Sequence, residues 1–334
     1  MATIVITGAT GFVGSALARA LHGRSHTVLG FARQTSDFSR LKDLDLGWII
    51  GDVLEPRSLE GAFEGADYVI HAAGMLGQAG VDEMAYQRLH VNGTNNVLAE
   101  LERMPRPPKL LYVSSPGVLG PIDGDSPPAD ETAPYAPSNA YERSKAAAEQ
   151  LVMVYAAQGL PVVITRPEFI YGPGDLHVLG LFTAVERGIF FYVGNGRNTC
   201  HPTYIDDAVD GMLRCLEHGR SGEIYHITGP APVSFRALAT TIANELGVAP
   251  PRLAVPKPLA WTGAVGLEVV GKLLRRDVPL SRTGVAFFSE DRRFSWQKAR
   301  DELGYQPQFD LARGVHETVA WYKENGYLGV KREA

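Results

Sequence analysis

The sequence predicts a doubly wound α/β fold, in which helices cover both faces of a parallel sheet. Short apolar segments alternate with helical segments through the first half of the chain, and this alternation is typical of right-handed βαβ units. A glycine-rich turn, Gly8 to Gly14, follows the first apolar segment and precedes the first helical one. After Arg166 and Pro167 the regular alternation ends, which indicates a second, smaller α/β region.

Composition narrows the function classes before any motif is considered. The chain has 334 residues, of which 45% are hydrophobic and 21% charged, as in an ordinary globular protein. The formal net charge is -5 and no run of Lys or Arg stands out, which disfavours nucleic acid and anionic membranes as partners. Cys200 and Cys215 are not spaced as a metal site or a disulfide framework, so we expect free thiols, no metal and a cytoplasmic location.

The alternation predicts the elements in order. Strands are expected at residues 3–7, 27–31, 48–51, 68–72, 110–114 and 162–165, and helices at 14–22, 58–63, 92–103 and 140–158. Later helices are expected at 206–216, 234–246, 297–303 and 311–324, with a strand at 223–228. The first set describes a Rossmann dinucleotide-binding domain over 1–167. Residues 168–334 are expected to form mainly a substrate-binding domain, from which segments near 203–228 can rejoin the main sheet.

The glycine turn predicts a dinucleotide site. Glycine lets the backbone approach a pyrophosphate without an intervening Cβ. The N-terminus of the following helix offers free N–H groups and a partial positive charge to the phosphates. The spacing is Gly-x-x-Gly-x-x-Gly, and its position between a strand and a helix makes it specific. The turn residues expected to contact the cofactor are Gly8, Thr10, Gly11, Phe12 and Val13.

The ends of the next strands extend this site. An acid after the second strand would bind the ribose 2′-hydroxyl of NAD, whereas an Arg accommodates the 2′-phosphate of NADP. Here Arg33 comes first and no acid precedes Asp37, so NADP is preferred over NAD. Asp52 and Val53 are expected beside the adenine. The small residues Ala72, Ala73 and Gly74 allow close approach of the cofactor.

A candidate acid–base group lies farther along the chain. Tyr141 and Lys145 are four residues apart in a predicted helix, so both side chains lie on one face. Tyrosine has a pKa near ~10, and a neighbouring ammonium would bring it closer to neutral pH. Ser114 and Ser115 lie at the end of a strand, at the edge of the sheet where ligands bind in doubly wound folds. A serine hydroxyl there can hold the substrate oxygen whose protonation accompanies hydride transfer.

Together these motifs resemble the extended short-chain dehydrogenase/reductase superfamily over nearly the whole chain. The segments that carry the resemblance are Thr7–Gly14, Asp52-Val53, His71–Gly74, Asn92–Thr94, Tyr112–Ser115, Tyr141–Lys145, Arg166-Pro167 and Tyr171–Gly174. The resemblance implies an NAD(P)-dependent enzyme, and a homodimer formed through the helices at 92–103 and 140–158.

The resemblance also assigns roles to single residues. Ser115 would be the catalytic serine, Tyr141 the acid or base, and Lys145 its activator, which also binds the nicotinamide ribose. Asn92 would kink its helix and support the lysine through water. Pro167 is expected to contact the cofactor.

One segment indicates the branch of the superfamily. Nucleotide-sugar members usually carry an Arg before the Tyr-Val-Asp-Asp segment, but Cys200 and His201 stand there, and Arg197 lies about a turn earlier. The chain is most similar to the 3β-hydroxysteroid dehydrogenase and dihydroflavonol reductase branch. That branch implies hydride transfer between a secondary alcohol and a ketone on a largely apolar, steroid-, flavonoid- or 3-oxoacyl-like substrate. The apolar stretch 258–274 would cover its pocket.

Five residues are candidates to line the substrate site, and two other functions stay open. The candidates are Met75, Pro116, Glu168, Phe169 and His201, although a single His beside a Pro is more often structural. The alternative enzyme is a nucleotide-sugar epimerase or dehydratase that keeps NAD tightly bound. A dinucleotide-sensing regulator is the alternative outside catalysis, but it would not need the Ser-Tyr-Lys set.

Overall fold

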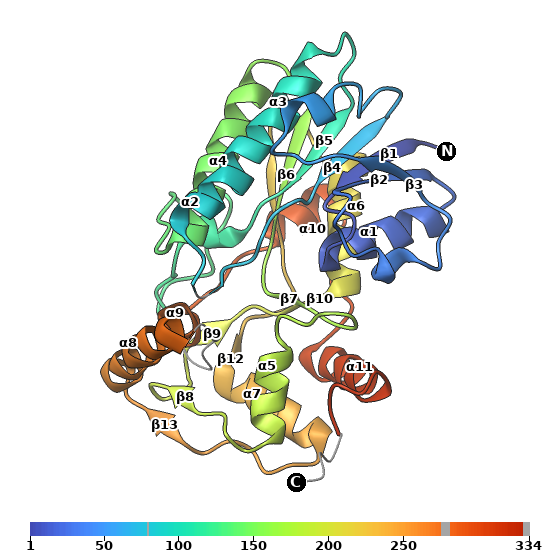
Figure 1. Cartoon of the computed structure of the whole chain (residues 1–334). Helices are drawn as coiled ribbons and strands as arrows, with labels where there is room; N and C mark the ends of the chain where they lie inside the picture. The colour runs from blue at the N-terminus through green and yellow to red at the C-terminus, as the bar shows by residue number, and fades with distance from the viewer. Residues whose placement is uncertain (79, 275–280, 330–334) are drawn as a thin grey trace.

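The main sheet confirms the doubly wound α/β prediction (Figure 1). The computed structural model describes residues 1–78, 80–274 and 281–329. Seven parallel strands pair in the order β11-β6-β5-β4-β1-β2-β3. These strands are β1 Thr3–Thr7, β2 Thr27–Ala32, β3 Gly47–Ile50, β4 Tyr68–His71, β5 Lys109–Val113, β6 Val162–Pro167 and β11 Ile224–Ile227. Because all are parallel, their C-terminal ends meet at one edge.

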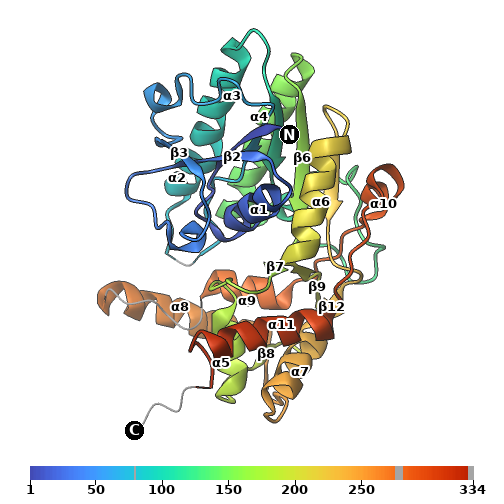
Figure 2. The same cartoon turned by 90° about the vertical axis from the view of Figure 1, so that its right-hand side faces the viewer.

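Helices cover both faces of this sheet (Figures 1 and 2). The first face carries α1, Phe12–Gly23, and α6, Ile205–His218; the second carries α2, Glu83–Tyr86, α3, Thr94–Arg103, and α4, Ala140–Ala157. Strand β1 shows how the sequence divides the core. Ile4 and Ile6 belong to the cluster that contains α1 and α6, while Val5 belongs to the cluster that contains α3 and α4. This alternation follows from the two-residue period of a strand buried on both faces.

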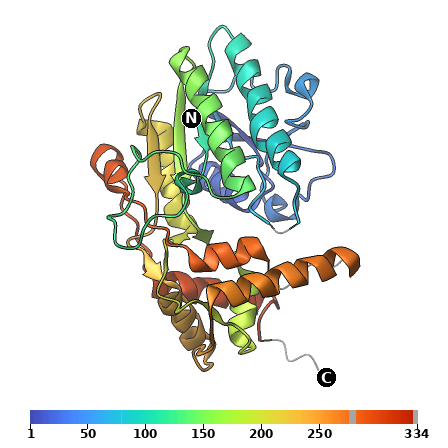
Figure 3. The same cartoon turned by 90° about the vertical axis from the view of Figure 1, so that its left-hand side faces the viewer.

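A second lobe lies beyond the C-terminal edge of the sheet (Figures 1 and 3). Its helices are α5 Leu179–Glu186, α7 Phe235–Leu246, α8 Lys257–Leu274, α9 Arg282–Ser289 and α11 Leu311–Glu324. Three short two-stranded sheets join them: β7 Ile170–Tyr171 with β10 Thr203–Tyr204, β9 Thr199–Cys200 with β12 Val233–Ser234, and β8 Tyr192–Val193 with β13 Ala254–Val255.

The second half of the chain also contributes to the first lobe. Strand β11 pairs with β6, and helix α6 packs against β5 and β6. Helix α10, Gln297–Leu303, packs against α6 and β11. The chain therefore crosses between the two lobes several times, and this anchors the second lobe beside the strand ends. In the part of the chain that the structure describes, no helix is both long and apolar enough to cross a membrane.

Two local predictions differ from the structure. The expected helix at 58–63 is only a 3₁₀ turn at Pro56–Leu59, because Gly61 and Gly65 take left-handed φ angles of +71° and +74° that end it. The helix expected to begin at residue 92 begins earlier. Helix α2 continues through a π-helical segment, Gln87–Gly93, into α3. Such wide turns are rare and often lie at functional sites.

Candidate active site

The glycine turn between β1 and α1 is compact because Gly8, Gly11 and Gly14 lack side chains. Gly8 has a φ of +74°, and a Cβ there would lie 2.7 Å from the Ala73 nitrogen at the end of β4. The Gly11 N–H donates to the Gly8 carbonyl at 3.0 Å. A Cβ on Gly14 would collide with the same carbonyl. The turn thus packs against two elements at distances that only glycine permits.

The N-terminus of α1 fits the pyrophosphate of a dinucleotide. Its N-cap residue, Gly11, makes no side-chain capping bond, and no acidic residue lies in the first turn of the helix. The first N–H groups of α1 therefore stay available to an anion, in the partial positive field of the helix terminus. Thr10, Phe12 and Val13 are half-buried around this point.

The other predicted cofactor residues lie at neighbouring strand ends. Asp52 accepts from the Leu54 N–H at 3.0 Å, and the carbonyl of the buried Val53 accepts from Asn96 at 2.9 Å. Ala72 and Ala73 lie against Gly8. The remaining members of the set are Gly74, which lies near the His90 ring, Pro167, which ends β6, and Arg33, which is exposed in the turn after β2.

Ser115, Tyr141 and Lys145 come together where β5 ends. The Lys145 ammonium, which is buried, donates to the Val113 carbonyl at 2.7 Å and lies 5.0 Å from the centre of the Tyr112 ring. Burial lowers the pKa of Lys145 to about 8. Ser115 is the second residue after β5, and its hydroxyl accepts from the Gly117 N–H at 3.1 Å.

The pKa of Tyr141 differs from the expectation. Burial raises it to about 12, and a hydrogen bond with the Ser115 side chain opposes this rise. The predicted lowering by a lysine is not seen: the desolvation of the phenolate is the largest cause, and the group that opposes it is Ser115. At neutral pH the Tyr141 hydroxyl is therefore protonated, which suits a proton donor.

The structure places His90, rather than Asn92, beside this group. Asn92 lies in the π-helical segment Gln87–Gly93 and is exposed. The His90 ring is buried, and its centre is 5.7 Å from that of Tyr141 in an edge-to-face arrangement.

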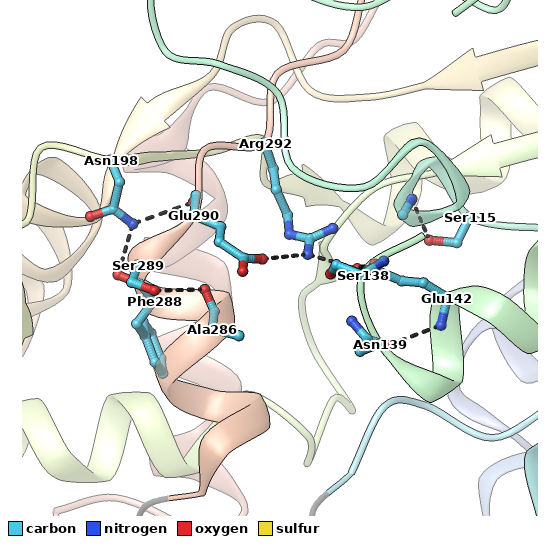
Figure 4. A network of polar contacts seen from close by, with 11 residues as sticks. Ser115, Ser138, Asn139, Glu142, Asn198, Ala286, Phe288, Ser289, Glu290 and Arg292 are labelled. Atoms are coloured by element: carbon cyan, nitrogen blue, oxygen red, sulfur yellow. Dashed lines mark hydrogen bonds and ion pairs between the residues drawn. The ribbon is translucent and has the colours of Figure 1, made fainter. Parts of the chain in front are cut away.

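A buried ionic network joins the second lobe to the start of α4 (Figure 4). Arg292 binds Glu142 at 2.7 Å and Glu290, just after α9, at 3.3 Å. Glu142 follows Tyr141 directly, and its carboxylate also accepts from the Ser138 N–H and hydroxyl at 2.7 and 2.8 Å. Asn198 binds the carbonyls of Phe288 and Glu290. Sequence reasoning missed Arg292, which lies 150 residues from its partner in the chain.

Glu168 and Phe169 lie at the edge of the sheet near this network. Burial raises the pKa of Glu168 to about 7, while the charge of Arg292 opposes the rise. Among the described residues its carboxyl group makes no hydrogen bond, although its backbone carbonyl accepts from Thr203 at 2.6 Å. Phe169 has a φ of +35°, a conformation that costs ~1–3 kcal/mol for a residue with a side chain and is commonest at functional sites.

The other substrate candidates are divided between two places. Met75 follows β4 and contacts His90, and Pro116 begins the buried turn Pro116–Leu119 beside Ser115. His201 is buried, and its ring nitrogens bind the Gly229 carbonyl at 2.9 Å and the Phe294 N–H at 3.5 Å. Both nitrogens therefore have partners within the fold, and none is left for a ligand.

Helix α9 presents an aromatic side chain to Phe169 at the edge of the sheet. Phe287 contacts Phe169 edge-to-face, with ring centres 5.3 Å apart. The stretch 258–274 lies within α8, which packs against α9 through small residues such as Ala260 and Ala264. Helix α8 thus supports α9, the helix that carries Phe287.

Comparisons with known proteins identify the family. The family model described as "NAD dependent epimerase/dehydratase family" matches residues 4–228. The chain belongs to this family. It is an enzyme of the extended short-chain dehydrogenase/reductase superfamily, as its motifs predicted.

Several of its relatives are named as reductases. The chain is 31% identical to a 2-alkyl-3-oxoalkanoate reductase from Stenotrophomonas maltophilia, over 95% of this chain and 98% of that protein. It is 30% identical to a 4-hydroxy-2-methyl-3-oxo-4-farnesyl-3,4-dihydroquinoline-1-oxide ketoreductase from Stigmatella aurantiaca, over 93% of each chain. Among solved structures, it is similar to gox2253, with a TM-score of 0.82, 30% identity and coverage of 98% and 99%.

A solved structure with bound cofactor is also similar. The dTDP-glucose 4,6-dehydratase DesIV from Streptomyces venezuelae, solved with NAD and TYD, has a TM-score of 0.79 and 26% identity over 97% of each chain. The cofactor in this neighbour is NAD, which agrees with the dinucleotide fit of the glycine turn.

The Gly11→Ala substitution tests the dinucleotide fit. The new Cβ would lie 3.3 Å from the Gly8 carbonyl, a contact that a small shift accommodates, but it would stand where the phosphates approach the helix. We expect NADH affinity, measured by nucleotide fluorescence, to fall at least ~10-fold. Gly23→Ala is the control, since a Cβ at this other end of α1 meets nothing within 4 Å. Wild-type affinity in a folded Gly11→Ala variant would contradict the assignment.

The raised pKa of Glu168 predicts a pH-dependent stability. The folded state keeps the proton up to about pH 7, whereas the unfolded chain loses it near 4.5. The native state therefore binds more protons in this window, and its stability falls as pH rises through it. Urea unfolding should show that the free energy of unfolding of wild type falls by roughly 2–3 kcal/mol more between pH 5 and pH 8 than that of Glu168→Gln. The other titrating groups are the same in the two proteins. If the free energies of unfolding of the two proteins changed equally with pH, the raised pKa of Glu168 would be refuted.

Proposed function

We propose that the protein is an NAD(P)-dependent reductase that interconverts a ketone and a secondary alcohol on a largely apolar substrate. The observation that carries this proposal is the grouping of Ser115, Tyr141 and Lys145 at the end of β5, on the same edge of the sheet as the glycine turn. Ligands of doubly wound folds bind at this edge. The names of the relatives support the same reaction class.

Each of the three side chains has a role in the proposed reaction. A bound nicotinamide dinucleotide supplies or takes up a hydride. Tyr141, protonated at neutral pH, donates its phenolic proton to the carbonyl oxygen of the ketone, and this oxygen becomes the hydroxyl of the alcohol. Ser115 holds the same oxygen through its hydroxyl. Lys145 stabilises the phenolate left on Tyr141, which then regains a proton from solvent.

The apolar character of the substrate is proposed from what surrounds the site. Phe169 and Phe287 present aromatic rings near the edge of the sheet. At positions 200 and 201, where nucleotide-sugar enzymes are expected to carry a diphosphate-binding Arg, Cys200 and His201 are buried and bonded within the fold. Met75, Pro116 and Glu168 complete the proposed substrate surface, and Glu168 would contribute its polar group.

NADP is the proposed cofactor, with NAD as the other possibility. Arg33 is exposed in the turn after β2, where its guanidinium is available to a 2′-phosphate. The first acidic residue after this strand is Asp37. Its carboxylate accepts from the Ser39 N–H at 2.9 Å and is thus engaged within its own turn rather than held out toward a ribose hydroxyl.

A nucleotide-sugar dehydratase or epimerase is the second candidate. The similarity to DesIV, over almost the whole chain, is the observation that favours it. An enzyme of this kind regenerates its cofactor in each cycle, so net consumption of NADH or NADPH distinguishes the two candidates.

The Tyr141→Phe substitution tests the proposed function. Wild type should consume NADPH or NADH with members of a panel of apolar ketones and 3-oxoacyl compounds, followed at the absorbance of the reduced cofactor. Loss of the phenolic hydroxyl should lower the turnover rate by ~10²–10⁴-fold without weakening NADH binding.

Tyr155→Phe is the matched control for this experiment. Tyr155 lies on the same helix, and its hydroxyl contacts only Asn95 at 3.4 Å among the described residues, so turnover should stay at the wild-type rate. Turnover of UDP- or dTDP-glucose without net cofactor consumption, and no activity toward any ketone, would replace the reductase proposal with the second candidate.

A further inference from the structure

Two aromatic side chains, Tyr86 and His90, pack against the ring of Tyr141. The ring centres of Tyr86 and His90 lie 6.0 and 5.7 Å from that of Tyr141, both in edge-to-face arrangements, and 5.7 Å from each other. Such pairs contribute ~0.5–1.5 kcal/mol beyond the area they bury. Both residues come from the helical stretch that precedes α3, and neither was used in the proposed reaction.

The same two side chains bind the loop 75–78, which follows β4. The His90 Nε2 atom lies 3.1 Å from both the N and the O of Met75. The Tyr86 hydroxyl accepts from the Gln78 N–H at 2.8 Å and lies 3.2 Å from the Leu76 carbonyl. A Cβ on Gly77 would lie 3.5 Å from the Tyr141 ring, so the loop packs against that ring.

His90 also reaches the first turns of α4. Its Nδ1 atom lies 2.8 Å from the Ser144 hydroxyl, which in turn donates to the Tyr141 carbonyl at 2.7 Å. Burial, with the nearby charge of Lys145, lowers the pKa of His90 to about 3, so the ring is neutral at pH 7. A neutral imidazole has one donor and one acceptor. Because the single proton of the Ser144 hydroxyl goes to the Tyr141 carbonyl, the imidazole proton lies on Nδ1, which donates to Ser144, and Nε2 accepts from the Met75 N–H.

We propose that His90 is a positioning residue: its ring packs against Tyr141, and its Nε2 atom holds the loop 75–78 against the Tyr141 ring. The inference rests on the proposed function for its catalytic consequence. The loop carries Met75, a proposed substrate residue, so its position should determine substrate affinity more than the proton transfer itself.

Two substitutions separate the two hydrogen bonds of His90. The amide of His90→Asn can take the place of Nδ1 and reach Ser144, but it is too short to reach Met75. The amide of His90→Gln can take the place of Nε2 and reach Met75, but it has no polar atom at the Nδ1 position. Val97→Ala is the control for stability alone, because Val97 is fully buried on the following helix, in the core between α3 and the sheet.

Amide hydrogen exchange of a peptide that contains residues 75–78 reports on the loop directly. We expect exchange in His90→Asn to be ~10-fold faster than in wild type, and in His90→Gln and Val97→Ala to stay within about two-fold. With a ketone that wild type reduces, His90→Asn should raise KM ~10-fold and change kcat by no more than about two-fold. Val97→Ala should lower only Tm.

Two results would overturn the assignment. One is unchanged loop exchange in folded His90→Asn, which would mean that His90 does not hold the loop. The other is faster exchange with an unchanged KM, which would mean that the loop has no part in binding substrate. If wild type reduces no ketone of the panel, the proposed function fails, while the exchange measurement still decides whether His90 holds the loop.

Discussion

The position of helix α4 on the sheet is the constraint on which the proposed site depends. Two buried polar contacts fix it. The Lys145 ammonium donates to the carbonyl of Val113 at the end of β5, and Glu149, one turn later, forms a buried ion pair of 2.5 Å with Arg166 of β6. Removing one partner of such a buried pair leaves an uncompensated charge, which is costly. These contacts therefore hold α4 in one register along the strands, and Tyr141 falls beside Ser115.

Close backbone packing fixes the opposite side of the site. The glycine turn lies against the end of β4, and the loop that continues from β4 passes over the Tyr141 ring. The glycine turn and Tyr141 thus both pack against the segment that follows β4. From the second lobe, Arg292 reaches Glu142 and joins the end of α9 to the residue that follows Tyr141. Three separate parts of the chain consequently set the position of one tyrosine.

Local patterns in the sequence predicted much of this arrangement. The strand–glycine–helix order at the start of the chain and the four-residue spacing of Tyr141 and Lys145 are short-range features, and the fold they predicted is confirmed. The helix expected at 58–63 does not form, because Gly61 takes a left-handed φ angle that ends the turn after Leu59.

What could not be predicted depends on contacts between distant segments. His90 meets Ser144 across 54 residues, and Arg292 meets Glu142 across 150. A single sequence has no periodicity that links such positions. The raised pKa values of Tyr141 and Glu168 arise from burial, which only the packed structure defines.

The central claim is that the site transfers a hydride between a nicotinamide and a substrate carbon, with net oxidation or reduction of the substrate. Mass spectrometry of the product formed from NADPH or NADH that carries deuterium at both C4 positions of the nicotinamide tests it most directly. We expect one deuterium on the carbinol carbon of the alcohol, and one equivalent of cofactor oxidised for each alcohol formed. A product that forms without deuterium and without cofactor consumption would contradict it.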